Sequence, residues 1–382
     1  MTLNFQQIYN QVQTINKEND LIYLKVLTKT TYNKLIKNVY NILQITQTIV
    51  KGSRSLYNTL SKQLFTEEEY NYKDFDLYCV DADLFYNLLL DELIKLNLKH
   101  IVKKEINPVF NDMLMISLYN QKYIDLQIID EIKFDIIPKI RINDINYIDP
   151  HFMKIDMYNV FATPTLFNVS GASEKFLKRI DFIEKEYKYK NINNIKLYNN
   201  TKLINSIKLV SKHIITGFLA YKLLFNINID IPFLEIFSTN PQVEINNIKK
   251  QININKIDKA YGIDYSTENL FILYQNDIPI VYIYRLTDCK SFIHKKNKLI
   301  STVNLLLYYF NICIYLNKYY YKLENKKIYN IKNIVYTTIL SKLYKKFNHK
   351  MISNCIGDMQ PIIIRNQQNK INNKKIKTTI TI

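Results

Sequence analysis

Two short segments of this sequence have residue types and spacing that could do chemistry. Gly52 and Ser53 interrupt a helical pattern, and Asp74 and Asp76 follow further along the chain. A glycine-serine turn at a helix start offers backbone N–H groups and a hydroxyl to a triphosphate. Residues i and i+2 of a strand point to one face, so both carboxylates can bind the same pair of divalent cations. Together the segments predict metal-dependent nucleotidyl transfer. An ordinary helix start and a solvated strand edge are the alternatives.

A series of predicted strands and helices would position these residues. The aspartates lie in a predicted strand, residues 72–80, whose Phe75 and Leu77 would face the core. Asp81 or Asp83 can cap the helix that follows, and further strands are predicted at 113–118 and 123–129. A helix before the turn has one apolar face, made of Tyr32, Leu35, Ile36, Val39, Tyr40 and Leu43. This order predicts a small mixed sheet flanked by helices.

The second half repeats this outline faintly. Gly217 opens a turn and a helix, and a strand at 233–238 follows with Glu235 as its one carboxylate. If the unit is duplicated, the second copy has lost its metal ligands. Between the two halves we predict an irregular connector that starts at 135–138, and the boundary between domains falls in the Asn- and Lys-rich residues 189–205.

Composition narrows the class of protein. The chain has 382 residues with 47% hydrophobic content, enough for two domains or one large one. Its net charge of +18 favours a polyanion, with nucleic acid ahead of an anionic membrane surface, although AT-rich coding also raises the lysine content. The four cysteines have no CxxC spacing, so we expect no zinc site, no disulfide framework and a reducing compartment. The apolar run 299–316 reads as a buried helix, and no membrane contact is expected.

At this point the residues resemble the catalytic subunits of poly(A) polymerases from poxviruses and giant DNA viruses. The likeness rests on the turn and aspartate pair, on the connector, and on the second-half pattern. The segments that carry it are 52–58, 74–76, 125–138, 147–156, 174–179, 217–221, 234–238 and 288–290. Together they span about residues 45–320, and the connector is the most specific part.

The resemblance implies an α+β fold with tandem nucleotidyltransferase-like domains, each a small mixed sheet flanked by helices, the second degenerate. The expected parts are an N-terminal helical segment (1–50), a catalytic domain (51–188), a degenerate C-terminal domain (206–366) and a basic tail (367–382). The implied reaction is template-independent addition of adenylates from ATP to the 3′ end of viral mRNA, with two Mg²⁺ or Mn²⁺ ions. A homodimer or a separate processivity subunit is expected, at work in the virion and the host cytoplasm.

The resemblance also assigns further site residues. Two ions need a third carboxylate, and the family pattern points to Asp125, with Asp130 and Asp135 as alternatives. Gly52, Ser53 and Arg54 are expected to bind the nucleotide. Lys175 and Arg179 are expected to face the triphosphate or the RNA, unless they belong to a solvated basic helix face.

Two other functions stay open from the sequence. One is a nucleotidyltransferase of different specificity, such as a terminal uridylyl transferase or an enzyme acting on tRNA. The other is a non-catalytic basic scaffold that binds RNA. The presence of both Asp74 and Asp76 argues against the scaffold, because decay of an active site usually removes such residues.

Overall fold

The computed structural model describes residues 27–60, 70, 73–106, 113–119, 121–164, 173–186, 199–261, 269–319, 339–340, 342–347 and 354–358. These residues form two compact units. The first contains the described residues up to Met153 and Asp181–Glu186, and the second contains Lys154–Ile180 and the described residues from 199 onward. The predicted basic tail lies outside the described residues. The predicted domain limits remain predictions.

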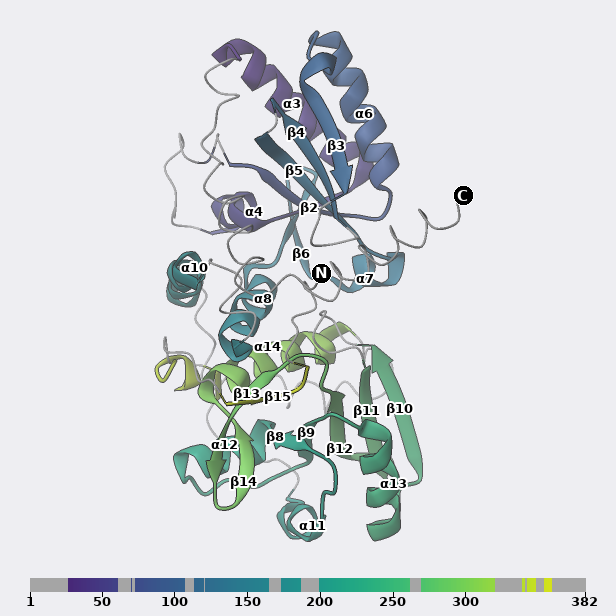
Figure 1. Cartoon of the computed structure of the whole chain (residues 1–382), viewed down its shortest axis with the longest axis vertical. Coiled ribbons are helices and arrows are strands. Elements are labelled where there is room, and N and C mark those ends of the chain that lie inside the picture. The colour runs from purple at the N-terminus through teal and green to yellow at the C-terminus, as the bar shows by residue number, and fades with distance from the viewer. Residues whose placement is uncertain are drawn as a thin grey trace, which may run out of the picture. The chain divides into compact units, whose positions relative to one another are not determined.

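In the described part of the first unit, seven strands form one mixed sheet in the order β3-β4-β5-β2-β1-β7-β6 (Figure 1). Strand β2 runs parallel to β5 and antiparallel to β1, and β1 runs parallel to β7. The strands are β1 (Ile49–Lys51), β2 (Phe75–Cys79), β3 (Val102–Ile106), β4 (Met113–Leu118), β5 (Gln121–Ile128), β6 (Lys139–Ile142) and β7 (Ile145–Ile148).

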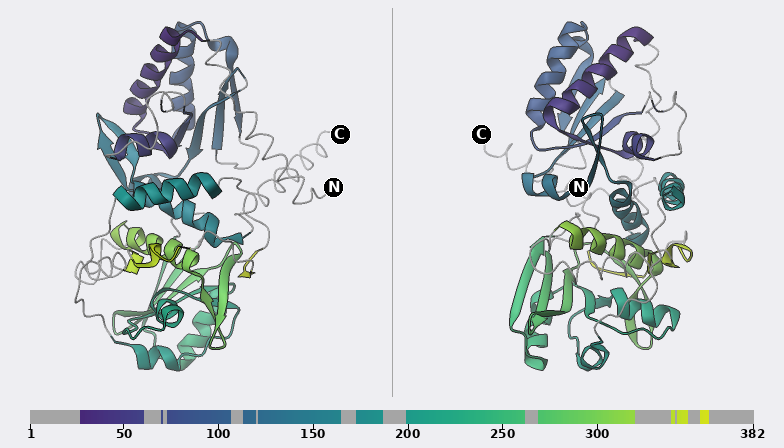
Figure 2. Two further views of the ribbon diagram at one scale, coloured as in Figure 1. Left: turned by 90° about the vertical axis from the view of Figure 1, so that its left-hand side faces the viewer. Right: turned by 180° about the vertical axis from the view of Figure 1, so that it is seen from behind.

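The helices of this part of the chain are α3 (Lys29–Thr46), α4 (Gly52–Thr59), α6 (Ala82–Lys95), α7 (Glu131–Ile136), α8 (Pro150–Ala162) and α10 (Ser173–Glu186), with a 3-10 turn at Lys99–Ile101. Helices α3 and α6 lie side by side on one face of the sheet, as both turned views show (Figure 2). The predicted apolar face of α3 is confirmed, since Leu35, Val39 and Leu43 are fully buried there. Asp81 caps α6 as predicted, because its carboxylate accepts a hydrogen bond from the Leu84 N–H at 2.8 Å.

The predicted irregular connector is wrong. The segment that follows Pro138 is the antiparallel hairpin β6–β7, and its turn residues Asn143 and Asp144 have φ angles of 49° and 61°. Positive φ at both central residues is the geometry of a two-residue hairpin turn, and Asn and Asp tolerate it. The connector therefore extends the sheet, and its strand β7 pairs directly with β1.

In the described part of the second unit, eight strands follow the order β10-β11-β12-β9-β8-β14-β13-β15. They are β8 (His213–Ile215), β9 (Leu234–Ser238), β10 (Lys256–Tyr261), β11 (Asn269–Gln275), β12 (Ile278–Arg285), β13 (Lys290–Lys295), β14 (Lys298–Ser301) and β15 (Cys355–Ile356). The helices are α11 (Thr201–Ser206), α12 (Gly217–Phe225), α13 (Pro241–Gln251) and α14 (Val303–Tyr319).

The two sheets share one topology. Without β15, each strand of the second sheet has a counterpart in the first, from β8 for β1 to β14 for β7, with the same neighbours. The directions agree as well: β9 is parallel to β12 and antiparallel to β8, as β2 is to β5 and β1. Helix α12 follows β8 as α4 follows β1. The predicted tandem fold is thereby confirmed.

One expectation from composition is also wrong. Cys289 and Cys355 form a disulfide, with their Cα atoms 5.3 Å apart, although no disulfide was predicted. Their wide spacing in sequence hid the pairing of β13 with β15, which brings Lys290 opposite Ile356 and Ser291 opposite Cys355. Among the described residues, no helix has both the length and the apolar character needed to span a bilayer.

Candidate active site

The glycine of the turn lies directly against one of the predicted catalytic carboxylates. Gly52 begins α4 with φ +67°, and a Cβ at this position would lie 2.2 Å from Asp76 Oδ2. Glycine is therefore required twice, for its backbone conformation and for the space. The preceding residue, Lys51, does not cap the helix with its side chain. The first turn of α4 thus meets Asp76, as the sequence predicted.

Two of the three predicted acids are neighbours in the sheet. Asp76 on β2 pairs in register with Asp125 on the parallel strand β5. Paired residues of adjacent strands lie on the same face, with the strands about 4.8 Å apart. Phe75 and Leu77 point to the opposite face and are fully buried in the core, as predicted. Asp130 and Asp135 are exposed beyond the end of β5, so Asp125 is the acid that the fold brings beside Asp76.

The third acid is joined to the site by a lysine. Lys122 Nζ lies 2.7 Å from Asp74 Oδ2 and 2.9 Å from Asp125 Oδ2. Sequence reasoning missed Lys122, because residues three apart in a regular strand point to opposite faces. The ladder between β4 and β5 is irregular here: Ile116 pairs with Ile124, and Ser117 pairs with Lys122. The extra residue turns Lys122 toward the acids.

Charge and burial compete in this cluster. Burial alone lowers the pKa of Lys122, but the carboxylates of Asp74, Asp76 and Asp125 outweigh it and raise that pKa well above the usual value. Burial raises the pKa of Asp125, and the Lys122 ammonium opposes that rise. The Lys122 side chain therefore stays protonated and positively charged among these acids.

Arg54 holds the backbone in front of Asp74. Its guanidinium is fully buried and donates to the Lys73 carbonyl from Nε at 3.0 Å and from Nη2 at 2.7 Å. It lies over the Phe75 ring at 3.7 Å, and Nη1 donates to Tyr40 Oη at 3.3 Å. Sequence reasoning placed Arg54 among the nucleotide-binding residues. In the structure it fixes the chain between Lys73 and Phe75, the two neighbours of Asp74.

The other predicted nucleotide-binding residues have mixed placements. Ser53 is buried in the first turn of α4. Lys175 is exposed on α10, and Arg179 on the same helix is buried. Both belong to the second unit, and their contact with a triphosphate or RNA stays a prediction.

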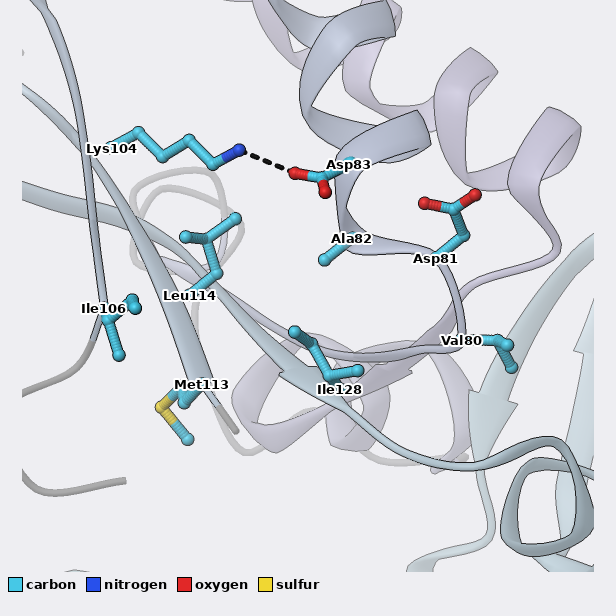
Figure 3. A pocket seen from close by; sticks show the side chains of 9 residues that line it. All are labelled: Val80, Asp81, Ala82, Asp83, Lys104, Ile106, Met113, Leu114 and Ile128. Carbon is cyan, nitrogen blue, oxygen red and sulfur yellow. Dashed lines mark hydrogen bonds and ion pairs between the residues drawn. The ribbon is translucent and has the colours of Figure 1, made fainter. Parts of the chain in front are cut away.

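A cavity of about 660 Å³ lies elsewhere on the first unit. Figure 3 shows its walls, with apolar side chains from the ends of β2, β4 and β5 and an ion pair of 2.7 Å between Lys104 and Asp83. The residues that line this cavity do not include Asp74, Asp76, Lys122 or Asp125. The cavity is therefore separate from the acidic cluster.

The acidic cluster has donors that suit a hard divalent cation. Carboxylate oxygens are the ligands that Mg²⁺ and Mn²⁺ prefer. Among the described residues, Asp125 Oδ1 is buried without a hydrogen-bond partner, and Lys122 already shows that a positive centre can reach Asp74 and Asp125 together. In the same part of the chain, no three His, Cys, Asp or Glu side chains are arranged as a ready metal site. The donor chemistry fits the ions, while the ammonium fills the position between two of the acids.

The second unit has no such cluster at the corresponding place. The Thr216 N–H donates to the Glu235 carbonyl, so Glu235 takes the position that Asp76 takes opposite Lys51. Tyr282 pairs with Glu235, as Asp125 pairs with Asp76. Phe233, two residues before Glu235, corresponds to Asp74. Two of the three acids are therefore replaced by aromatic residues.

Comparisons with known proteins show what this chain is similar to. Residues 37–166 match the family model of the poly(A) polymerase catalytic subunit, and this range contains Gly52, Asp74, Asp76, Lys122 and Asp125. The predicted resemblance to poly(A) polymerase catalytic subunits, and with it the prediction of an enzyme of that class, is confirmed.

The likeness in fold extends further than the family match. The crystal structure of the Megavirus polyadenylate synthase is similar with a TM-score of 0.73 at 18% sequence identity, over 98% of this chain and 84% of that one. No curated protein sequence matches this chain.

Proposed function

We propose that this protein adds adenylates from ATP to the 3′ end of RNA without a template, using two divalent ions. One observation carries the proposal: Asp76 and Asp125 are in register on adjacent strands, and Asp74 reaches the same positive centre as Asp125, beside the helix start at Gly52. This is an arrangement in which a triphosphate and its ions can be held on one face of the sheet, over the neighbouring strands β2 and β5.

The reaction is an in-line displacement at the α-phosphorus by an RNA 3′-hydroxyl. Two bound ions, Mg²⁺ or Mn²⁺, would make that hydroxyl more acidic and neutralise the leaving pyrophosphate. Asp74, Asp76 and Asp125 are the residues that would hold them. The buried Asp125 is fixed within β5, while Asp74 stands directly before β2 and is more exposed. Asp125 therefore sets the position to which the substrate must adjust.

The first turn of α4 would bind the phosphates. Gly52 lets the backbone approach closely, and the backbone N–H groups of the turn carry the positive end of the helix dipole. The Ser53 hydroxyl adds a donor. Lys175 and Arg179 are proposed to contact the triphosphate or the RNA from α10.

The positive net charge of the protein supports RNA, a polyanion, as its partner. A net charge of +18 draws RNA toward the protein and makes its binding weaken as salt increases. We further propose that the protein acts on viral mRNA in the virion and the host cytoplasm, as a homodimer or with a separate processivity subunit.

A primer-extension assay tests the activity. Purified protein, an RNA primer and Mg²⁺ or Mn²⁺ are incubated with each of the four nucleotides in turn. We expect long extension with ATP alone. A preference for UTP or CTP would instead support a uridylyl transferase or an enzyme acting on tRNA.

A variant pair tests the site. The double variant D74A/D76A should lose tailing by about a thousandfold or more while it still binds RNA, because it lacks the ion ligands. The control D130A/D135A removes two exposed acids outside the cluster and should tail normally. Normal tailing by D74A/D76A would show that these aspartates do not carry the reaction, whereas failure of the unchanged protein to add any nucleotide would favour the non-catalytic RNA-binding scaffold.

A further inference from the structure

One cation of the acidic cluster is supplied by the chain itself. Lys122 Nζ contacts Asp74 Oδ2 at 2.7 Å and Asp125 Oδ2 at 2.9 Å. We propose that Lys122 is an internal counter-ion that holds these two acids together in the metal-free enzyme and is displaced when a catalytic ion binds. Lys122 is thus a positioning residue that tunes ion affinity. This inference rests on the proposed function, because it takes the aspartates to be ion ligands.

The geometry allows one positive centre at a time. A small divalent ion such as Mg²⁺ binds carboxylate oxygens at about 2.0–2.1 Å, and its ligands here would be the carboxylates that now accept from the ammonium. Two positive centres within a few ångströms of each other repel strongly in a partly buried site. Ion and ammonium therefore compete for Asp74 and Asp125.

Burial indicates which group moves. The Lys122 side chain is 30% exposed, whereas that of Asp125 is 9% exposed. Lysine has a flexible stem and three donors that water satisfies readily. Asp125 is fixed within β5, and its Oδ1 atom, buried without a partner among the described residues, is left available to an ion. The lysine withdraws toward solvent, and the acid stays.

The second unit provides an internal comparison. The same irregularity is present between β11 and β12: Leu273 pairs with Val281, and Tyr274 pairs with Pro279. Pro279 therefore stands where Lys122 stands in the first unit. The bulge persists in the copy without the acids, but the ammonium does not. The presence of a lysine at position 122 is thus explained by its contacts with the acids. The bulged strand alone does not require it.

The displacement has a consequence for the order of binding. Ions alone have to expel an ammonium that Asp74 and Asp125 hold by ion pairs of 2.7 and 2.9 Å. A nucleoside triphosphate brings further negative charge to the same place and so attracts the ions. The ions then replace the ammonium as the positive charge beside the carboxylates. We expect ions to bind weakly to the free protein and tightly together with ATP.

The test is Mn²⁺ binding by the whole protein without nucleotide or RNA, followed by electron paramagnetic resonance. K122M should bind Mn²⁺ about tenfold or more tightly than the unchanged protein, because one unit charge is removed beside the ion. K104M is the matched control. It also removes a lysine paired with an aspartate in this sheet, at the cavity away from the cluster, and should leave Mn²⁺ affinity unchanged.

Two more variants keep the inference falsifiable if K122M does not fold. K122Q removes the charge but keeps a polar side chain and should give the same gain, while K122R keeps the charge and should stay within about twofold of the unchanged protein. Equal or weaker Mn²⁺ binding by the folded neutral variant would overturn the inference.

Thermal unfolding supplies an independent readout. The neutral variant should be less stable than the unchanged protein in chelator, because its acids lack a counter-ion, and should gain more in Tm from Mn²⁺. An equal Mn²⁺-induced shift in both proteins would contradict the displacement.

The two proposals can fail separately. If D76A binds Mn²⁺ as the unchanged protein does, the proposed ion site itself is wrong. If D76A loses Mn²⁺ but the neutral Lys122 variant gains nothing, only the role of Lys122 is wrong.

Discussion

Asp76 and Glu235 occupy the same position in two sheets that share one strand order. Each stands opposite the residue before a glycine that opens a helix with positive φ. Asp76 is half-buried at the helix start, whereas Glu235 is 1% exposed and accepts hydrogen bonds from the Phe218 N–H at 2.7 Å and the Tyr309 hydroxyl at 2.8 Å. In the second unit the carboxyl group accepts directly from the first turn of the helix, at the place where we propose that the first unit binds the phosphates of its substrate.

Glu235 should therefore stabilise the fold and take no part in the reaction. E235A leaves two buried donors without an acceptor, and we expect it to lower the free energy of unfolding by about 2–4 kcal/mol. E235Q keeps an acceptor and should lower it by less. Urea unfolding gives the free energies, and tailing per folded molecule should stay unchanged. A stable E235A variant that cannot tail RNA would contradict this assignment.

The two helix-opening glycines should respond differently to one added methyl group. In G52A the Cβ collides with the Asp76 carboxylate, so we expect tailing to fall about a hundredfold or more, since small displacements of reacting groups have effects of that size. In G217A the Cβ would lie 1.7 Å from Glu235 Oε2 in the core. Primer extension and thermal unfolding separate the two results.

The larger loss of activity should belong to G52A and the larger loss of Tm to G217A. Both variants share the strain of a side chain at positive φ, about 1–2 kcal/mol, so each controls for the other. The reverse ranking would mean that the second unit, and not the first, holds the reaction site.

Arg54 should affect the reaction through Asp74. R54K keeps a positive charge but cannot make both hydrogen bonds to the Lys73 carbonyl or stack as a plane on Phe75. We expect kcat to fall at least about tenfold with a smaller change in the KM for ATP, because the position of Asp74 changes while the helix start at Gly52 remains. A rise in KM alone, with kcat unchanged, would point to direct contact with the nucleotide.

The number of free thiols shows whether the disulfide is formed. In oxidised, denatured protein a thiol reagent should find only Cys79 and Cys313, since Cys289 and Cys355 are joined. In the folded protein Cys79 should hardly react at pH 8, because burial raises its pKa to about 12 and keeps it protonated. Detection of all four thiols in oxidised protein would show that the disulfide does not form in solution.

Removal of the disulfide should also reduce stability. The bond joins residues 66 positions apart, a loop length for which chain entropy gives about 4 kcal/mol. Unfolding in urea with and without a reductant measures the difference, and C355S serves as the genetic counterpart. Equal free energies of unfolding in both conditions would contradict the prediction.

Much of the first unit could be predicted because local patterns and tertiary structure agree there. The helical face of α3, the cap at Asp81 and the alternation of Phe75, Asp76 and Leu77 each depend on short-range chemistry that the sequence displays. We could predict that Gly52 lies close to Asp76, because a glycine that opens a helix precedes a short strand that carries acidic residues. The family resemblance supplied Asp125, which no local pattern separates from Asp130 and Asp135.

What could not be predicted depends on long-range pairing or on irregular backbone. Lys122 faces the acids only because one residue of β5 is bulged, and no period in the sequence announces it. The Cys289–Cys355 bond depends on the pairing of two strands far apart in the chain. Arg54 stood in the phosphate-binding turn, and its burial against Phe75 is a matter of packing. The Asn143-Asp144 turn was a readable hairpin signal that we did not use.

If Asp74, Asp76 and Asp125 hold the ions for adenylyl transfer, the ions themselves should be visible beside these side chains. A crystal of the protein with Mn²⁺ and a non-hydrolysable ATP analogue, measured at the manganese absorption edge, locates the ions by anomalous scattering. We expect manganese peaks within coordination distance of the three aspartates, with Lys122 Nζ moved away from Asp74 and Asp125. Manganese bound only elsewhere, with the ammonium still between those carboxylates, would contradict the account.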